Sequence, residues 1–265
     1  MFITLFYVIL FGLAIGSFLN VVIYRLHENK SIVHGRSFCP CCQHTLSFFD
    51  LIPVFSFIFL RGKCRYCQKK ISWQYPAVEL ATAILFALAY LNYFHLSGFP
   101  RSYNLLYLSV GQLFADLFFL SVLLVVFVYD LKHYLILDMV VLPAAALALA
   151  TNLLLGMAWQ SLLLGAAVAS GFFLLQYAIS RGKWIGFGDV KLGLLLGFLL
   201  GWPQILVCLF LAYILGGLVG LGLIFSGRKG IKSELPFGTF LSVAAVVTML
   251  WGDQILNWYL RAIGF

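Results

Sequence analysis

The chain has 265 residues, of which 63% are hydrophobic and only 10% are charged, and it carries a formal net charge of +8. Its mean hydropathy is +1.03, and its apolar segments of roughly 17 to 25 residues match the thickness of a bilayer. These values exclude an ordinary soluble domain and predict an all-α polytopic membrane protein with about eight transmembrane helices and a small cysteine-rich cytoplasmic domain between helices 1 and 2. Residues 1–24 have no basic region before a long apolar run, so we expect a retained first helix and not a cleaved signal peptide.

The predicted helices follow from the apolar segments, and several of them start with a proline in the first turn, at Pro76, Pro203 and Pro236. One of them, at 190–201, is short. In chain order the expected helices are 2–24, 76–96, 105–129, 139–156, 160–180, 190–201, 203–226 and 236–252.

Basic residues are distributed very unevenly between the loops. With the N-terminus outside, 15 of the 17 Lys and Arg residues fall on the inner side of the membrane, and only Arg101 and Arg261 fall on the outer side. Cytoplasmic loops collect Lys and Arg, which predicts this orientation. The positive charge therefore reports topology and does not call for a nucleic-acid partner. The basic residues on the inner side are Arg25, Lys30, Arg36, Arg61, Lys63, Arg65, Lys69, Lys70, Lys132, Arg181, Lys183, Lys191, Arg228, Lys229 and Lys232.

The longest polar interruption, residues 25–75, contains two CxxC pairs: Cys39 with Cys42 and Cys64 with Cys67. This spacing is typical of a four-thiolate structural zinc site, and a segment of this size lacks a core of its own, so a metal would supply stability. Two disulfides are the alternative, but they rarely persist in the cytoplasm.

Other potential ligands lie close to these pairs. Cys41 interrupts the first one, and His34 and His44 are near enough along the chain to replace a ligand, although the spacing favours Cys39 and Cys42.

Two acids lie at the edges of long apolar segments on the predicted cytoplasmic side. Asp130 ends the run LFFLSVLLVVFVYD, and Asp189 belongs to GFGD, directly before VKLGLLLGFLLG. Ionisable groups at membrane depth are costly and usually functional. Gly186 and Gly188 would let the backbone at Asp189 come close to a neighbouring chain or to a substrate strand. Two carboxylates that share a proton can activate water, so we predict Asp130 and Asp189 as a catalytic pair.

Three further acids compete with this pair or support it. Asp138 is expected at a helix N-terminus, where it would cap the helix or support the site. Glu79 is expected on the cytoplasmic side, either lining the same cavity or compensating a helix dipole. Asp116 lies about 21 Å from Asp130 along a straight helix, too far to share its site, and Gln112 one turn earlier suggests a polar face toward the bundle interior.

Seven sequence blocks in order resemble the bacterial type IV prepilin peptidases, also called prepilin leader peptidases, which are GxGD aspartyl membrane proteases. The resemblance covers nearly the whole chain. It departs from the family pattern at Gln74, Leu137 and Thr239, where the family often has Arg, Pro and Pro. The blocks are GSFLNVVIYRL at 16–26, the CxxC pairs, DLIPVFSFIFLRGKCRYC at 50–67, YPAVEL at 75–80, DLKHYLILD at 130–138, GFGDVKL at 186–192 and PFGTF at 236–240.

The resemblance implies an activity, a substrate and a location. The catalytic acids of the family fall on Asp130 and Asp189, and residues 76–265 would form the peptidase domain. The implied substrates are prepilins and type II secretion pseudopilins, whose leader is cleaved at the cytoplasmic face of the bacterial inner membrane. Many members then methylate the new N-terminus with S-adenosylmethionine. Gln74 lies in the part of the family associated with methyl transfer, and no glycine-rich loop for this cofactor is present.

Two other classes of protein compete with a peptidase. A multipass transporter would use intramembrane acids for cations or protons, but it would need them nearer the bilayer centre, which only Asp116 satisfies. A membrane assembly scaffold would use the cysteine-rich domain for docking and would tolerate Asp130→Asn. The sequence makes no prediction of the substrate's identity or of the oligomeric state.

Overall fold

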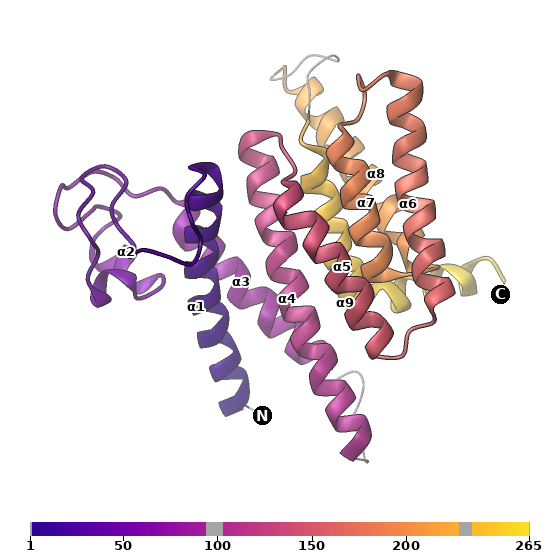
Figure 1. The fold of residues 1–265 in the computed structure, drawn as a ribbon, viewed down its shortest axis with the longest axis horizontal. Helices are drawn as coiled ribbons and strands as arrows, with labels where there is room; N and C mark the ends of the chain where they lie inside the picture. Colours follow the sequence, from indigo (N-terminus) through magenta and orange to yellow (C-terminus); the bar gives the residue numbers. More distant parts are fainter. Residues whose placement is uncertain (1, 94–102, 228–234, 265) are drawn as a thin grey trace. The chain divides into compact units, whose positions relative to one another are not determined.

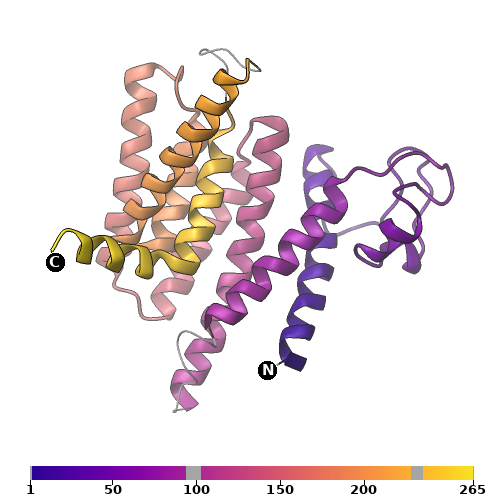
Figure 2. The same ribbon diagram turned by 180° about the vertical axis from the view of Figure 1, so that it is seen from behind.

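The computed structural model describes residues 2–93, 103–227 and 235–264, with side chains described from Val110 onward in the second range. The described chain forms two compact units, residues 1–109 and 110–265, and each is helical (Figures 1 and 2). The elements are α1 (Phe2–His27), η1 (Phe48–Leu51), α2 (Phe55–Phe59), α3 (Gln74–Leu91), α4 (Tyr103–His133), α5 (Asp138–Leu154), α6 (Trp159–Ser180), α7 (Phe187–Leu200), α8 (Gln204–Phe225) and α9 (Phe237–Ala262).

Within the described ranges, six helices are long and apolar enough to cross a membrane: α1, α3, α4, α6, α8 and α9. The all-helical membrane class is therefore confirmed. Helix α5 is a shorter apolar helix, and α7 has 14 residues, so the predicted count of eight spans stays a prediction. The predicted end of one helix at 96, and the charges Arg101, Arg228, Lys229 and Lys232, lie outside the described residues.

Several predicted helix ends were wrong, and each difference has a local cause. Helix α4 continues to His133, where Tyr134 adopts φ 55° and ends it. Helix α7 begins at Phe187 because the Asp189 carboxylate accepts the backbone N–H of Gly186 and so caps the first turn. Helix α9 continues through Gly252, which is buried, and ends only at Ala262, ten residues beyond the predicted end.

In the N-terminal unit, α1 and α3 pack against each other through the glycines of α1. A Cβ at Gly12 would lie 2.7 Å from Ala83 Cα, and one at Gly16 would lie 2.6 Å from Glu79 Cα. No side chain fits in that space, so these glycines allow the two backbones to approach closely, as small residues do between membrane helices. The polar side of this contact includes Asn20, whose amide donates to the carbonyl of Tyr75 at 3.0 Å.

The chain that leaves α1 folds around a buried guanidinium. Arg25 is 6% exposed, and its two terminal nitrogens donate to the backbone carbonyls of residues 31, 32, 34, 35 and 36 at 2.8 to 3.3 Å. A charged group of this kind is tolerated in the interior because all of these acceptors face it. Arg25 therefore orders the segment that leads into the first CxxC pair.

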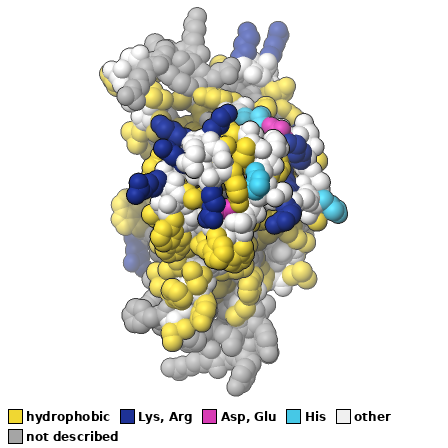
Figure 3. All heavy atoms as spheres, turned by 90° about the vertical axis from the view of Figure 1, so that its left-hand side faces the viewer, with side chains coloured by type: hydrophobic (Ala, Val, Ile, Leu, Met, Phe, Trp, Pro, Cys, Tyr) yellow, Lys and Arg dark blue, Asp and Glu magenta, His cyan; other side chains and the backbone are white. Residues whose placement is uncertain are grey.

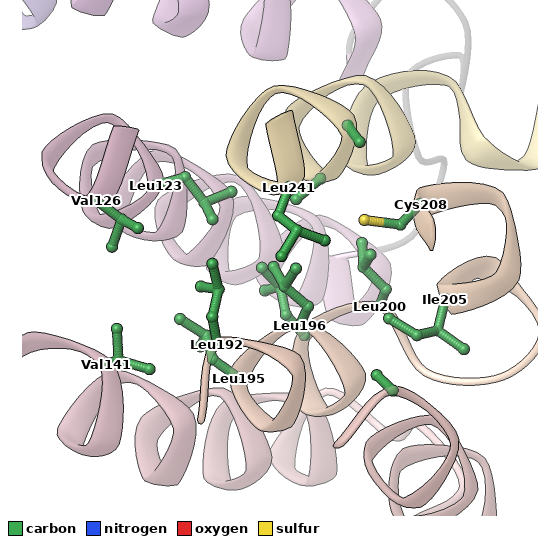
Figure 4. Close-up of a cluster of buried hydrophobic side chains, with 14 of the residues drawn as sticks. Leu123, Val126, Val141, Leu192, Leu195, Leu196, Leu200, Ile205, Cys208 and Leu241 are labelled. Carbon is green, nitrogen blue, oxygen red and sulfur yellow. The ribbon is translucent and has the colours of Figure 1, made fainter. Parts of the chain in front are cut away.

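In the C-terminal unit, α7 is the central helix and packs against α5, α6, α8 and α9. A helix that is apolar on every side is buried on every side. Leu192, Leu195 and Leu196 are fully buried and meet Leu123 of α4, Val141 of α5 and Leu241 of α9 (Figure 4). This core holds the first turn of α7, which carries Asp189, in a fixed place within the unit.

Small residues bring α6 and α7 into close contact. A Cβ at Gly197 would lie 2.2 Å from Ala166 Cα, a distance that real Cβ atoms do not reach. We expect Gly197→Ala to lower the free energy of unfolding by about 1–3 kcal/mol, because the two backbones must separate. Gly217→Ala in α8 is the matched control, since no atom lies within 4 Å of its Cβ position. Thermal unfolding in detergent should show a lower Tm for Gly197→Ala only, and equal Tm values would contradict the close packing.

Candidate active site and metal centre

Asp130 and Asp189 are both buried in the C-terminal unit, 4% and 7% exposed. Asp130 lies in the last turn of α4, and Asp189 lies in the first turn of α7. The two carboxylates are close enough for their charges to interact. The structure thus brings together the two acids that the sequence singled out, although a long stretch of chain separates them.

The first turn of α9 forms a cradle for the Asp130 carboxylate. The backbone N–H of Thr239 donates to Asp130 Oδ2 at 2.9 Å. Gly238 leaves room for this contact, because a Cβ there would lie 2.9 Å from the same oxygen. The N–H groups of a first turn have no partner within their own helix, and the helix dipole favours a negative group at this end. Sequence reasoning missed both residues; the available signal was the block PFGTF, with Pro236 at the start of a helix.

Asp189 is held differently, at the N-terminus of its own helix. The backbone N–H of Gly186 donates to its Oδ2 at 3.1 Å, whereas its Oδ1 is buried and has no hydrogen-bond partner. The close approach expected at Gly188 is present, but the neighbour is a side chain: a Cβ there would lie 2.9 Å from Ile136 Cβ.

Ile136 lies in the short segment between α4 and α5 and touches both helix starts. Its Cδ1 would lie 3.0 Å from a Cβ on Gly238, and its Cβ lies against Gly188. Ile136 is therefore a shared apolar neighbour of the two glycines that flank the acids. Such a buried, apolar setting strengthens the interaction between two carboxylates and favours a pair that carries one proton.

Aromatic side chains of α6 and α8 pack against the first residues of α7 and α9. Tyr213 is close enough to interact electrostatically with Asp189, and its hydroxyl is paired with the side-chain amide of Gln176. The Tyr213 ring lies 5.0 Å from that of Phe237, and the Tyr177 ring lies 5.5 Å from that of Phe187.

The other acids have partners of their own. Asp138 begins α5 and pairs with Lys191 of α7, with 55% of its side chain exposed. Glu79 is buried in the N-terminal unit and accepts the backbone N–H of Val54 at 2.8 Å. Asp116 accepts a hydrogen bond from Gln112 at 3.1 Å, as their spacing indicated. The supporting roles of Asp138 and Glu79 in catalysis stay predictions.

The four cysteines of the CxxC pairs form one cluster. The Sγ atoms of Cys39, Cys42, Cys64 and Cys67 all lie within 4.8 Å of one another, and those of Cys39 and Cys67 are 3.9 Å apart. Four thiolates at ~2.3 Å from a tetrahedral zinc ion would be about 3.8 Å apart. The donor set and its spacing therefore fit a metal ion.

Both CxxC pairs adopt the same backbone turn. The N–H of Gln43 donates to the carbonyl of Cys39, and the N–H of Gln68 donates to that of Cys64, each at 2.9 Å. Gln43 and Gln68 share a φ of 58°. The two turns bring their four thiols together, so two separate sequence motifs form a single centre.

Neighbouring groups adjust the thiols of this cluster. Burial opposes ionisation of Cys39, but hydrogen bonds from the N–H groups of Cys42 and Cys41 and from nearby thiols lower its pKa to about 7. The N–H of Lys69 favours ionisation of Cys67, but burial and hydrogen bonds with the other thiols raise its pKa to about 12. The two shifts belong together, because one thiolate forms first and accepts hydrogen bonds from the thiols that stay protonated.

The alternative ligands lie outside the cluster. Cys41 is exposed, the ring of His44 stacks on Tyr66 with centroids 3.7 Å apart, and His34 is within hydrogen-bond distance of Ser31. Cys208 is buried in the core of the C-terminal unit, as expected of a small apolar residue.

Asp50 ties the segment before α2 to the second CxxC turn. Its Oδ2 accepts hydrogen bonds from the N–H and hydroxyl of Ser47 and from the hydroxyl of Tyr66, and its Oδ1 lies 2.9 Å from Arg65 Nε. Burial opposes ionisation, but the bonds from Ser47 and Tyr66 and the charge of Arg65 lower the pKa of this carboxyl. The ionised carboxylate therefore braces the turn at neutral pH.

The surface of the cysteine-rich segment carries far more basic than acidic groups. Figure 3 faces this segment and shows Lys and Arg side chains around it, with few acids. Residues 25–75 contain eight Lys and Arg residues but only Glu28 and Asp50 as acids. This excess of basic residues is one of the observations that predict a cytoplasmic location for the segment.

The helices and the buried acid pair together define a class of protein: a multi-pass membrane protein with two carboxylates meeting at helix ends, joined to a four-cysteine module. Two family models match the chain, the bacterial peptidase A24 N-terminal domain over residues 10–93 and the type IV leader peptidase family over residues 117–221. The chain belongs to the type IV leader peptidase family. It is a multi-pass bacterial membrane protein.

Curated relatives match over nearly the full length. The chain is 34% identical to the prepilin leader peptidase/N-methyltransferase of Bacillus subtilis over 253 residues, 95% of this chain and 96% of the relative. It is 33% identical to the protein of the same name from Aeromonas salmonicida, covering 97% and 94% of the two chains. The Pseudomonas aeruginosa protein of that name is 31% identical, with 97% and 93% covered. No solved structure matches the chain significantly.

Proposed function

We propose that this protein is an aspartyl peptidase that removes the leader from prepilins and pseudopilins, with Asp130 and Asp189 as its catalytic pair. The observation that carries this proposal is the meeting of two buried carboxylates at the starts of α7 and α9. The names of the full-length relatives supply the substrate class. A transporter is disfavoured, because the acid pair lies at helix ends and Asp116 is paired with Gln112.

The chemistry requires one proton between the two acids. The ionised carboxylate takes a proton from water, and the resulting hydroxide attacks the scissile carbonyl carbon while the protonated carboxyl donates its proton to the carbonyl oxygen. The C–N bond of the tetrahedral intermediate then breaks. The leaving amine takes the proton gained from water, and a hydroxyl of the intermediate returns a proton to the other carboxylate, which restores the pair.

The same protein would methylate the new N-terminal amine with S-adenosylmethionine, as the names of the relatives indicate. We assign this cofactor no residues. Zinc is the metal that best suits four thiolates, and Cys39, Cys42, Cys64 and Cys67 would hold it in a structural role, since four protein ligands leave no open position for a substrate. We propose the inner membrane as the location, with the N-terminus outside and the acids at the cytoplasmic face, where the basic loops lie.

Purified protein in detergent tests both activities in one reaction. Incubation with a prepilin and S-adenosylmethionine labelled on its methyl group should release the leader and label the mature N-terminus. Mass spectrometry of the product separates the two steps. Intact prepilin after incubation would refute the peptidase, whereas cleavage without label would leave a peptidase alone.

A further inference from the structure

The two carboxylates are alike in burial but not in their hydrogen bonds. Of the polar side-chain atoms in the described part of the chain, two are buried without a hydrogen-bond partner, Asp50 Oδ1 and Asp189 Oδ1. Asp50 Oδ1 has Arg65 Nε beside it at 2.9 Å. Asp189 Oδ1 has neither a hydrogen-bond partner nor an ion pair of this kind, and neither oxygen of Asp130 is buried without a partner.

This difference separates the two acids electrostatically. A negative oxygen buried without a donor carries its full desolvation cost, whereas a protonated oxygen carries much less. An N–H bond from a helix N-terminus stabilises a carboxylate in its ionised form. Asp189 Oδ2 receives such a bond from Gly186 at 3.1 Å, and Asp130 Oδ2 receives a shorter one from Thr239 at 2.9 Å. Thr239 is at the third position of α9, where its N–H has only a longer contact of 3.3 Å to the Pro236 carbonyl within its own helix. The feature that distinguishes the two acids is therefore the second oxygen of Asp189, which is buried without a donor.

We propose that the first turn of α9 assigns the roles of the pair: Thr239 is a positioning residue whose N–H keeps Asp130 ionised as the base, and Asp189 carries the shared proton on Oδ1. This inference rests on the proposed function. Asp130 then takes the proton from water and later passes it to the leaving amine. Asp189 gives its proton to the scissile carbonyl oxygen and recovers one when the intermediate collapses.

Gly238 completes the cradle. A methyl group at this position would lie 2.9 Å from Asp130 Oδ2 and 3.1 Å from its Cγ, so any side chain there displaces the carboxylate. The hydroxyl of Thr239 takes no part in this contact, because it donates to the Pro236 carbonyl at 2.6 Å. The backbone N–H of Thr239, and not its side chain, is therefore the group that acts on Asp130.

This distinction provides a matched pair of variants. Thr239→Pro removes the N–H at a first-turn position that tolerates proline, whereas Thr239→Ala removes the hydroxyl and keeps the N–H. The rate of prepilin cleavage is measured across pH for both variants and for the wild type. We expect the acidic limb of kcat/KM to move to higher pH by about one unit in Thr239→Pro, because the ionised base has lost its donor. The limb should stay in place in Thr239→Ala, even if losing the hydroxyl lowers its stability.

The outcomes separate this inference from the proposed function. A wild-type protein that leaves prepilin intact refutes the function itself. If the wild type cleaves and the limb of Thr239→Pro coincides with it, or if both variants move equally, only the assignment of roles is overturned. If Thr239→Pro does not fold, Gly238→Ala tests the same cradle with the N–H retained. A fall in kcat of about 10- to 100-fold at unchanged KM supports the cradle, and an unchanged kcat contradicts it.

Discussion

Asp130→Asn and Asp189→Asn should each reduce leader cleavage by on the order of 10²–10⁴-fold in kcat/KM, the size of a lost acid–base group. Asparagine keeps the size and the hydrogen-bonding reach of the side chain but neither accepts nor donates the proton that the reaction moves. The loss should therefore appear while the protein remains folded. Gel-based cleavage of a prepilin by detergent-solubilised protein, together with thermal unfolding, measures both quantities.

Asp253→Asn is the matched control for these variants. Asp253 lies exposed in α9, where it accepts a hydrogen bond from Gln204 at 2.6 Å. Its replacement makes the same chemical change away from the pair and should leave cleavage intact. The double variant of Asp130 and Asp189 should be no slower than the worse single variant, because the two acids act as one unit. A wild-type cleavage rate in either single variant would refute the proposal that the two acids are the catalytic pair.

Cys64→Ser should remove the bound metal and unfold the cysteine-rich segment. The structural zinc sites of small domains contribute on the order of 10 kcal/mol of folding free energy at neutral pH, and residues 31–73 contain little other regular structure than η1 and α2. We expect the metal content to fall from one equivalent to nearly none, and proteases to cut within this segment. Elemental analysis and limited proteolysis of the full-length protein measure the two effects.

Cys41→Ser provides the comparison for this variant. Cys41 is an exposed neighbour of the first CxxC pair and lies outside the cluster. Its replacement should retain the metal and the protease resistance. An equal loss of metal in Cys41→Ser would show that the ligand set is wrong. An unchanged metal content in Cys64→Ser would refute the proposed four-cysteine metal site.

Local sequence signals predicted most of the helices but not all of their ends. Long apolar runs report burial or membrane depth wherever they occur, so α1, α6 and α8 lie within a few residues of their predicted ranges. The starts and ends depend on single hydrogen bonds. The capping of α7 by Asp189 is one such bond, and no periodicity in the sequence reveals it.

The neighbours of the two acids show where sequence reasoning stops. Asp130 and Asp189 stood out because ionisable groups are rare in so apolar a chain. Thr239 and Gly238 did not, because they act through a backbone N–H and through the absence of a side chain. Ile136 likewise resembles any other apolar residue until α7 and α9 pack around it.

The amino-acid sequence alone determined the membrane class, the two acids and the four cysteines, because composition and motif spacing are local properties. The tertiary structure decided how these groups are held. It packed α7 into the core, it brought the first turn of α9 onto Asp130, and it left one oxygen of Asp189 without a partner. These contacts join residues far apart along the chain, and their geometry follows from helix packing. The difference between the two acids therefore exists only in the folded protein.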